Sequence, residues 1–284
     1  MTVDRLTSLF DRFRVSAQMF HAGALCGRTH FSAKPGLGFV HVLRAGTLKI
    51  EHRKTRSGPP HRMTLTEPTL LFYPRPLDHD LVYPDEDGSQ LVCATLRFEG
   101  GAMHPIARGL PPLVVVPLSQ APSLATTLEL LFAEADHARC GRPLLANRLF
   151  EVLLIQLLRW LLDREDLPEG LLAGLADPQL SRALVAMHEQ PAHPWDLPAL
   201  AERAGMSRSA FAAAFKRVVG DTPAEHLAQW RLALAQQRLA SGDAIKRVAL
   251  DVGYGSASAL SRAFAARVGA SPRAWLAGQA ASAA

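Results

Sequence analysis

The sequence contains few cysteines and no apolar run long enough to cross a membrane. Its three cysteines, Cys26, Cys93 and Cys140, lie far apart and form no Cys-x-x-Cys pair, which argues against a disulfide framework and a structural zinc site. The longest apolar stretch, residues 149–162, contains three charged or polar residues and is too short to span a bilayer. Residues 1–20 carry charges and lack the apolar core of a secretory signal. We therefore expect reduced thiols, a cytoplasmic location and no membrane partner.

The sequence also lacks a strong overall charge. Its 284 residues carry a formal net charge of +5, and 48% of them are hydrophobic, which is typical of a globular protein with two domains. Residues 172–284 contain 12 Lys and Arg against 8 Asp and Glu, so most of the positive excess lies in this part. Such a bias is compatible with contacts to phosphate groups, although solvated charged surfaces are commoner.

Between residues 36 and 98 the sequence predicts an all-β domain. Thr47, Lys49 and Glu51 alternate with Leu48 and Ile50, which is the period of a half-buried strand. Gly and Pro separate several such segments, as expected for a sandwich or barrel. The predicted strands cover residues 38–43, 46–52, 62–65, 69–73, 79–83 and 90–98.

After Pro117 the apolar periodicity changes from that of strands to that of helices. Residues 122–138 and 143–164 carry apolar side chains at helical spacing and predict two helices. The segment that follows contains acidic clusters, Pro168, Gly170 and Gly174, which indicates a linker. We divide the chain into a β domain (1–118), a helical dimerisation and connecting segment (119–166), a linker (167–177) and an all-helical domain (178–284).

The last hundred residues predict a series of helices. Asp196, Ser207, Thr222 and Asp243 are residue types that cap helix N-termini, and each precedes a segment with helical periodicity. The predicted helices cover residues 179–190, 197–204, 207–218, 223–240, 244–252 and 256–268.

An internal repeat with a period of 48 or 49 residues runs through this helical part. In each copy a short helix ends at a glycine, the chain turns through about three residues, and a second helix begins. Phe211 and Phe215, or Leu260 and Phe264, lie four residues apart and share the face that packs on the first helix. The repeat therefore predicts two helix-turn-helix motifs. The matching positions are Ala201, Gly205, Met206, Ser209, Phe211, Phe215, Gly220, Thr222, Pro223 and Leu227, and then Ala249, Gly253, Tyr254, Ser258, Leu260, Phe264, Gly269, Ser271, Pro272 and Leu276.

The inward face of each second helix determines which side chains face outward. Helix-turn-helix proteins place this helix in the major groove of DNA and contact bases through its early outward residues. The predicted DNA contacts of the first motif are Arg208, Ser209, Ala212 and Ala213, with Lys216 nearer the phosphate backbone. Those of the second motif are Ser258, Ser261 and Arg262. Arg262 is the strongest candidate for reading a base, because a guanidinium can contact guanine O6 and N7 together.

Several motifs occur together within residues 179–276. They are Leu197-x-x-Leu-Ala-x-x-Ala-Gly-Met-Ser207, Phe211-x-x-x-Phe-Lys216, Gly220-x-Thr-Pro223, Arg231, Val248-Ala-x-x-x-Gly-Tyr254, Arg262-x-Phe264 and Gly269-x-Ser-Pro272. Taken jointly, they resemble the DNA-binding domain of AraC/XylS-type transcription regulators. Leu260 and Ala265 depart from the family, which usually has a phenylalanine and often a basic residue there. The resemblance implies a sequence-specific regulator, an activator by analogy, that binds promoter major grooves and works with RNA polymerase. It also implies a homodimer, formed either through the β domain or through the helices at 122–164.

Two fragments of the β domain resemble the cupin-type sensor domains of this family. They are Val42-Leu-Arg-Ala-Gly-Thr-Leu48 and Leu70-Leu-Phe-Tyr-Pro-Arg-Pro-Leu-Asp-His79. The resemblance implies a small-molecule effector near His41 or His79, or an oxidant sensed by Cys26. Alternatively, the histidines are ordinary polar residues and Cys26 is a small buried residue. A metal-binding cupin needs a His-x-His pair and a following Glu, which His41 and Glu51 do not supply, so we expect no metal and no cofactor.

Three functional classes remain open. The first is an effector-controlled regulator without enzymatic activity. The second is a metal-dependent cupin enzyme fused to a DNA-binding module, which elemental analysis of the pure protein would detect. The third is an architectural DNA binder without a ligand, which would lack a sharp sequence preference.

Overall fold

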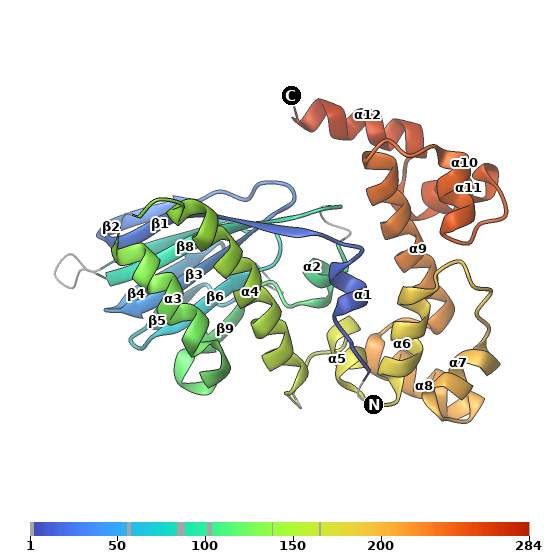
Figure 1. The fold of residues 1–284 in the computed structure, drawn as a ribbon, viewed down its shortest axis with the longest axis horizontal. Helices are drawn as coiled ribbons and strands as arrows, with labels where there is room; N and C mark the ends of the chain where they lie inside the picture. Colours follow the sequence, from blue (N-terminus) through green and yellow to red (C-terminus); the bar gives the residue numbers. More distant parts are fainter. Residues whose placement is uncertain are drawn as a thin grey trace. The chain divides into compact units, whose positions relative to one another are not determined.

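The computed structural model describes residues 3–55, 58–83, 89–100, 104–137, 139–164 and 166–283. The chain forms two compact units. The β unit contains the described residues of 15–102 and 106–167, and the helical unit contains those of 1–14, 103–105 and 168–284. An N-terminal β-rich domain and a C-terminal helical domain are the predicted fold class, which the structure confirms (Figure 1).

Two antiparallel sheets form the β unit within the described residues (Figure 1). A five-stranded sheet has the order β1-β8-β3-β6-β9, and a four-stranded sheet has the order β2-β7-β4-β5. The strands are β1 (Val15–Leu25), β2 (Gly27–Phe31), β3 (Leu37–Ala45), β4 (Leu48–His52), β5 (Arg62–Leu65), β6 (Thr69–Tyr73), β7 (His79–Tyr83), β8 (Ser89–Phe98) and β9 (Val114–Pro117). The sequence predicts β3 to β8 but not β1, β2 or β9. Strand β1 lies at a sheet edge and is mostly exposed or half-buried, so its apolar alternation is weak.

Side chains that alternate along the strands form a hydrophobic core between the two sheets. Leu48 and Ile50 are fully buried whereas Lys49 between them is exposed, as the period of two predicts. The core comprises Phe31, Phe39, Leu43, Leu48, Ile50, Leu65, Leu71, Tyr73, Leu81, Tyr83, Leu91 and Cys93. The four-stranded sheet therefore has one buried and one solvated face.

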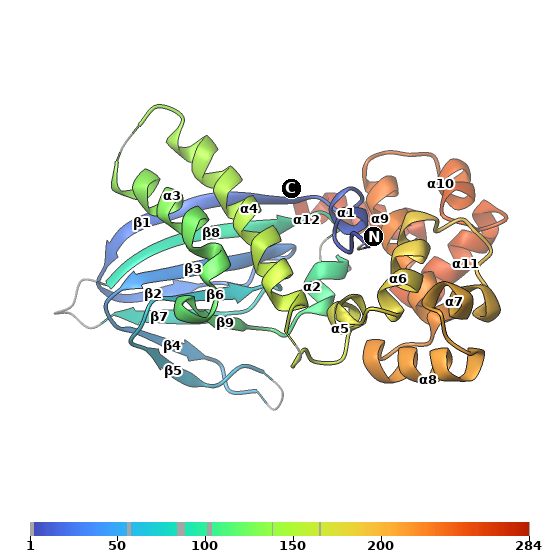
Figure 2. The same cartoon turned by 60° about the horizontal axis from the view of Figure 1, so that its bottom comes forward.

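Both faces of the five-stranded sheet are buried. Helices α3 (Ala125–Asp136) and α4 (Arg142–Leu162) lie across its outer face (Figure 2). Val42 and Phe72, which alternate with the core residues of β3 and β6, are fully buried on that side. The smaller elements of this unit are α2 (Pro105–Gly109) and the 3-10 turns η2 (Leu118–Gln120) and η3 (Pro122–Leu124).

Six helices of the helical unit match helices predicted from the sequence, and their bounds differ from the predicted bounds by at most one residue. These are α6 (Leu180–Glu189), α7 (Leu197–Ala204), α8 (Arg208–Val219), α9 (Pro223–Ala240), α10 (Ile245–Asp251) and α11 (Ala257–Val268). The sequence did not predict the short helices α1 (Thr7–Phe10) and α5 (Leu171–Ala176) or separate α12 (Pro272–Ala283). No helix in the described part of the chain is long and apolar enough to cross a membrane.

Two sequence predictions differ from the structure of the helical unit. The segment predicted as a linker contains α5, whose Leu171, Leu172 and Leu175 are buried, so these leucines outweigh the flanking glycines and proline. The prediction that Asp243 caps α10 is wrong. Ala244 is the N-cap residue, and the Asp243 carboxylate instead accepts a hydrogen bond from Arg238 Nε at 2.7 Å.

Candidate nucleic-acid interface

The first helix-turn-helix motif consists of α7, a short turn and α8 (Figure 1). The Asp196 carboxylate caps α7 by accepting a hydrogen bond from an amide of its first turn. Gly205 has a φ of +67°, which ends α7 in the left-handed conformation that glycine adopts without strain. The Ser207 hydroxyl then caps α8. These local signals explain why the sequence predicted the motif closely.

Two phenylalanines determine which side of α8 faces solvent. Phe211 and Phe215 are fully buried, and their ring centroids lie 5.5 Å apart in an edge-to-face arrangement. The predicted contacts that the structure leaves exposed are Arg208, Ser209, Ala213 and Lys216. Sequence reasoning did not select Ala210, which is exposed beside them and belongs to the same outward face.

Ala212 differs from the other predicted contacts on α8. It is half-buried and lines a pocket of about 330 Å³ with apolar side chains of α7 and α9, such as Leu200 and Leu227. Ser209 and Ala213 are therefore the small side chains among the predicted contacts of α8 that remain exposed.

The second motif, built from α10 and α11, repeats the first at the level of single hydrogen bonds. The amide of Tyr254 donates to the carbonyl of Ala249 at 2.8 Å, just as the amide of Met206 donates to that of Ala201 at 2.9 Å. Ser256 caps α11, and the buried positions are taken by Leu260 and Phe264. The internal repeat in the sequence is therefore a repeat in structure.

The outward side of α11 carries two exposed predicted contacts. Ser258 and Arg262 are exposed, whereas Ser261 is half-buried. Arg262 has no ion-pair partner among the described residues, so its guanidinium is available to a ligand. Ala265 and Ala266 continue this exposed side by one turn, at the spacing of three and four residues that sequence reasoning could have used.

Helix α9 joins the two motifs and is fixed at its start and in its middle. A capping box begins it: Thr222 and Glu225 exchange side-chain and backbone hydrogen bonds, which hold the pKa of the Glu225 carboxyl below its usual value. In the middle, the Arg231 guanidinium donates to the carbonyls of Pro191, His193 and Gly253 at 2.6, 3.0 and 3.3 Å. Arg231 therefore ties the segment before α7 to the turn of the second motif.

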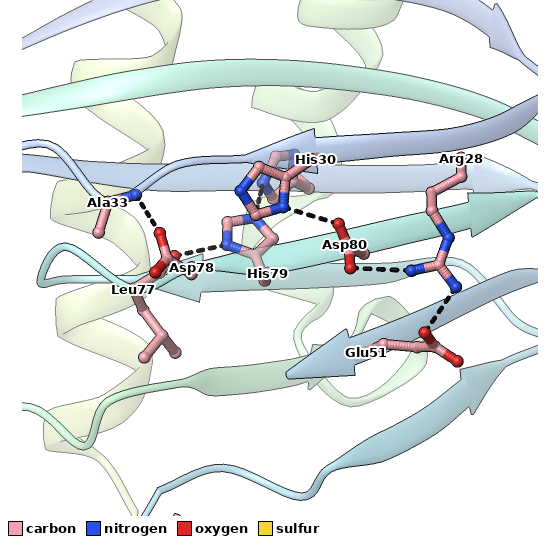
Figure 3. Close-up of polar contacts among 9 residues, drawn as sticks. Arg28, His30, Ala33, Glu51, Leu77, Asp78, His79 and Asp80 are labelled. Carbon is pink, nitrogen blue, oxygen red and sulfur yellow. Dashed lines mark hydrogen bonds and ion pairs between the residues drawn. The ribbon is translucent and has the colours of Figure 1, made fainter. Parts of the chain in front are cut away.

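In the β unit, two of the three predicted effector residues meet between the sheets. His41 on β3 and His79 on β7 are buried, and their Nε2 atoms lie 2.9 Å apart. His79 Nδ1 donates to the Leu77 carbonyl at 2.8 Å (Figure 3), so its Nε2 must accept the proton of His41 Nε2. His41 Nδ1 is then an unprotonated acceptor, buried and without a partner among the described residues.

Burial keeps this histidine pair neutral. Desolvation lowers the pKa of His79 to about 4 and places the pKa of His41 well below its usual value. His52, which accepts a hydrogen bond from the Tyr73 hydroxyl at 3.0 Å, also has a lowered pKa through burial. These buried imidazole groups in the interior of the β unit are therefore uncharged.

Charged side chains of the four-stranded sheet lie on its solvated face. The Arg28 guanidinium bridges Glu51 and Asp80 at 2.7 and 2.9 Å, as Figure 3 shows. Glu51 thus points away from the histidine pair. No group of three or more His, Cys, Asp or Glu side chains placed to hold a metal occurs in the described ranges, so the residues present do not fit a cupin metal centre.

Cys26, the third predicted effector residue, lies apart from this buried pair. It occupies the connection between β1 and β2 and is exposed, so the alternative interpretation as a small buried residue is wrong. Cys93 is the buried thiol, and burial raises its pKa, which makes it a poor nucleophile.

Comparisons with known proteins agree with both units. A cupin family model matches residues 4–163, and a helix-turn-helix domain model matches residues 200–278. An AraC-like transcription regulator of Streptomyces lividans is 41% identical over 95% of each chain. A second, from Streptomyces antibioticus, is 40% identical over 64% of this chain and 61% of its own length. The RCS-specific HTH-type transcriptional activator RclR of Escherichia coli is 27% identical over 84% of this chain and 85% of its own.

Proposed function

Because the chain belongs to the AraC-like transcription regulators, DNA-binding proteins with this helix-turn-helix domain, we propose that it recognises specific promoter DNA through α8 and α11. The observation that carries the proposal is the repeated motif with two matched exposed helix faces. Helix α9, of 18 residues, spans about 27 Å at 1.5 Å per residue, close to the roughly 34 Å repeat of DNA. Two reading helices joined by such a spacer suit successive turns of one DNA face.

The two helices have different chemistry toward DNA. On α11, Arg262 can donate two hydrogen bonds to one guanine, which distinguishes guanine from the other bases. On α8, Ser209 and Ala213 offer little hydrogen bonding, whereas Arg208 and Lys216 carry charge. We assign base reading mainly to α11, and positioning on the phosphates mainly to α8.

The proposal is tested by Arg262→Ala. On a site selected from random DNA with the full chain, we expect affinity to fall by about 1–3 kcal/mol, roughly 5- to 150-fold, with relaxed preference at one base pair. Fluorescence anisotropy titrations on that site and on random DNA measure both effects. Arg97→Ala removes another exposed arginine, on β8, and serves as the control. An equal loss on both DNAs would contradict base reading by Arg262.

We further propose that the protein is a homodimer that associates through α3 and α4. Large apolar side chains on these helices are exposed to solvent, and contiguous exposed apolar patches commonly mark interfaces. Leu145 and Val152 of α4 are 47% and 43% exposed and lie two helical turns apart, and Leu130 of α3 is 55% exposed. A second copy could bury this face.

A charge in the middle of this face should separate the protomers. We expect Val152→Asp to convert the dimer to a monomer, because an aspartate buried without a partner costs several kcal/mol. Sedimentation velocity over a range of concentrations measures the change. Leu250→Asp, on the 62% exposed Leu250 of α10, introduces the same charge elsewhere and should leave the dimer intact. A wild-type monomer, or a dimeric Val152→Asp variant, would refute the assignment of this interface.

We propose that the β unit binds the small-molecule effector or senses the oxidant that controls the regulator. We also propose that the regulator acts as an activator with RNA polymerase. The activator role is supported by the relative RclR, whose name describes a transcriptional activator. A small-molecule effector is supported by the unpartnered Nδ1 of His41, which can accept a hydrogen bond from a ligand. An oxidant is supported by the exposed thiol of Cys26. A crystal of the purified protein with density for a bound molecule beside His41 would decide for the effector.

A further inference from the structure

A pocket of about 330 Å³ opens at the surface of the helical unit beside α8. Its volume falls within the range of about 300–1,000 Å³ that is usual for small-molecule sites. The residues that line it belong to α7 and the two positions before it, to α8, and to the cap and first turns of α9. The pocket therefore lies entirely in the DNA-binding unit, and none of its lining residues comes from the β unit.

Aliphatic side chains make most of this pocket apolar. Leu200 of α7 and Leu227 of α9 are 2% and 6% exposed and line its buried side. Leu197, at the first position of α7, also lines the pocket and is 38% exposed. Ala212 contributes only a methyl group from α8, so the space that a larger side chain would fill there is left open. An apolar molecule in the pocket would cover this surface, which is favourable in water.

Two polar side chains that line the pocket already donate their protons within the protein. Trp195 Nε1 donates to the carbonyl of Gln190 at 3.0 Å. The Thr222 hydroxyl donates to Glu225 Oε2 at 2.7 Å and accepts from the Glu225 amide at 3.3 Å, as part of the capping box of α9. An indole and a hydroxyl each carry a single proton to donate. Neither side chain therefore has a donor left for an anionic ligand.

Asp196 is the one charged side chain among the residues that line the pocket, all of which the structure describes. Its Oδ1 accepts from the amide of Ala199 at 2.9 Å, and it forms no ion pair with any described residue. The guanidinium of Arg203 lies over the Trp195 ring instead, 5.7 Å from the ring centroid. Asp196 is exposed, so its second oxygen is available to a ligand. The pocket therefore combines an apolar surface with one unpaired negative charge, which attracts a cation.

We propose that this pocket binds a small organic cation that consists of an aromatic body and a single protonated amine. The body contacts Leu200, Leu227 and the methyl group of Ala212, and the ammonium group pairs with Asp196. The Trp195 ring favours an aromatic body, because aromatic rings pack well against one another edge-to-face or offset. Such a molecule contacts α8 directly. The DNA-binding unit thus has a ligand site of its own, in addition to the effector site proposed in the β unit.

Binding of 1-naphthylmethylamine to the full chain tests the charge that the pocket selects. The uncharged 1-naphthylmethanol has the same aromatic body and serves as the matched probe. We expect isothermal titration calorimetry at low salt to show that the amine binds about two- to fivefold more tightly than the alcohol, because exposed ion pairs contribute modestly. Asparagine caps helices as well as aspartate does, so Asp196→Asn removes the charge and keeps the cap of α7. In this variant the two probes should bind equally.

A larger side chain at position 212 tests the location of the site. Ala212→Leu fills the pocket from α8, so we expect it to weaken binding of both probes by about tenfold or more. Ala240→Leu makes the same substitution at an exposed position of α9 outside the pocket, and it should bind both probes as the wild type does. Where Ala212→Leu fails to fold, as judged by circular dichroism, the comparison of probes on Asp196→Asn decides. The proposal is overturned if the wild type does not bind the amine at millimolar concentration, or if Asp196→Asn and folded Ala212→Leu both bind it unchanged.

Discussion

Proline at position 213 is expected to abolish specific DNA binding. Ala213 is exposed in the middle of α8, which runs from Arg208 to Val219. Proline has no amide proton, and its ring clashes with the carbonyl four residues earlier, here that of Ser209, which costs about 3 kcal/mol or more within a helix. Because 1.4 kcal/mol corresponds to a factor of ten, we expect an affinity loss of more than about 100-fold on the selected site.

The same variant tests whether the two units are independent. The dimer face proposed on α3 and α4 lies in the β unit, so Ala213→Pro should keep the wild-type sedimentation coefficient. Ala213→Ser retains the helix at a cost of about 0.5 kcal/mol and controls for the loss of the methyl group. Ala213→Pro protein that binds DNA like the wild type would exclude α8 from the interface. A simultaneous loss of dimer and DNA binding would contradict the division into separate domains.

The helix-turn-helix motifs were predictable because their determinants are local. The cap at Ser207, the left-handed glycine at Gly205 and the seam of Phe211 and Phe215 lie within ten residues of one another. The duplicated pattern at Gly253 strengthened the prediction. Helix bounds were accordingly predicted within one or two residues. Side-chain exposure was less predictable, since Ala212 is half-buried and lines a pocket together with residues of α7 and α9.

Features that depend on long-range contacts were not predictable in the same way. Residues 4–14 contain four apolar side chains within a charged segment, and Trp230, which packs against Phe13, lies more than 200 residues away. The pairing of His41 with His79 needs the two sheets to face each other. Apolar periodicity predicts which residues are buried, but not which buried residues contact one another.

Arg231 shows both what the sequence predicts and what it does not predict. Its removal is the second change from which we expect a large effect. The family resemblance singled out this residue, but its role follows only from its three acceptors, which belong to two distant segments. Hydrogen bonds to charged groups contribute about 1.5–3 kcal/mol each when buried, and Arg231 is half-buried, so we expect Arg231→Ala to cost about 2–4 kcal/mol. For a unit of this size the melting temperature should fall by on the order of 10 °C.

DNA binding should fall further than stability alone requires. Without Arg231, the segment before α7 and the turn at Gly253 are no longer tied to the same guanidinium, so α8 and α11 lose their fixed relative position. Arg231→Lys should recover only part of the loss, because one ammonium cannot match three carbonyls reached by a planar fork. Differential scanning calorimetry and anisotropy titration below the melting temperature of the variant separate the two effects.

Gly253→Ala provides an independent disruption of the same clamp. Gly253 has a φ of +89°, and a Cβ there would lie 2.8 Å from Arg231 Cζ and 2.9 Å from the Ala192 Cα. The alanine is therefore strained and also displaces the guanidinium, so we expect Gly253→Ala to lower DNA affinity in the same direction as Arg231→Ala. Combining the two changes should cost less than their sum, because both act on one clamp. Full additivity in the double-mutant cycle would mean that the guanidinium and the glycine act separately, and that Arg231 does not hold the two motifs together through Gly253.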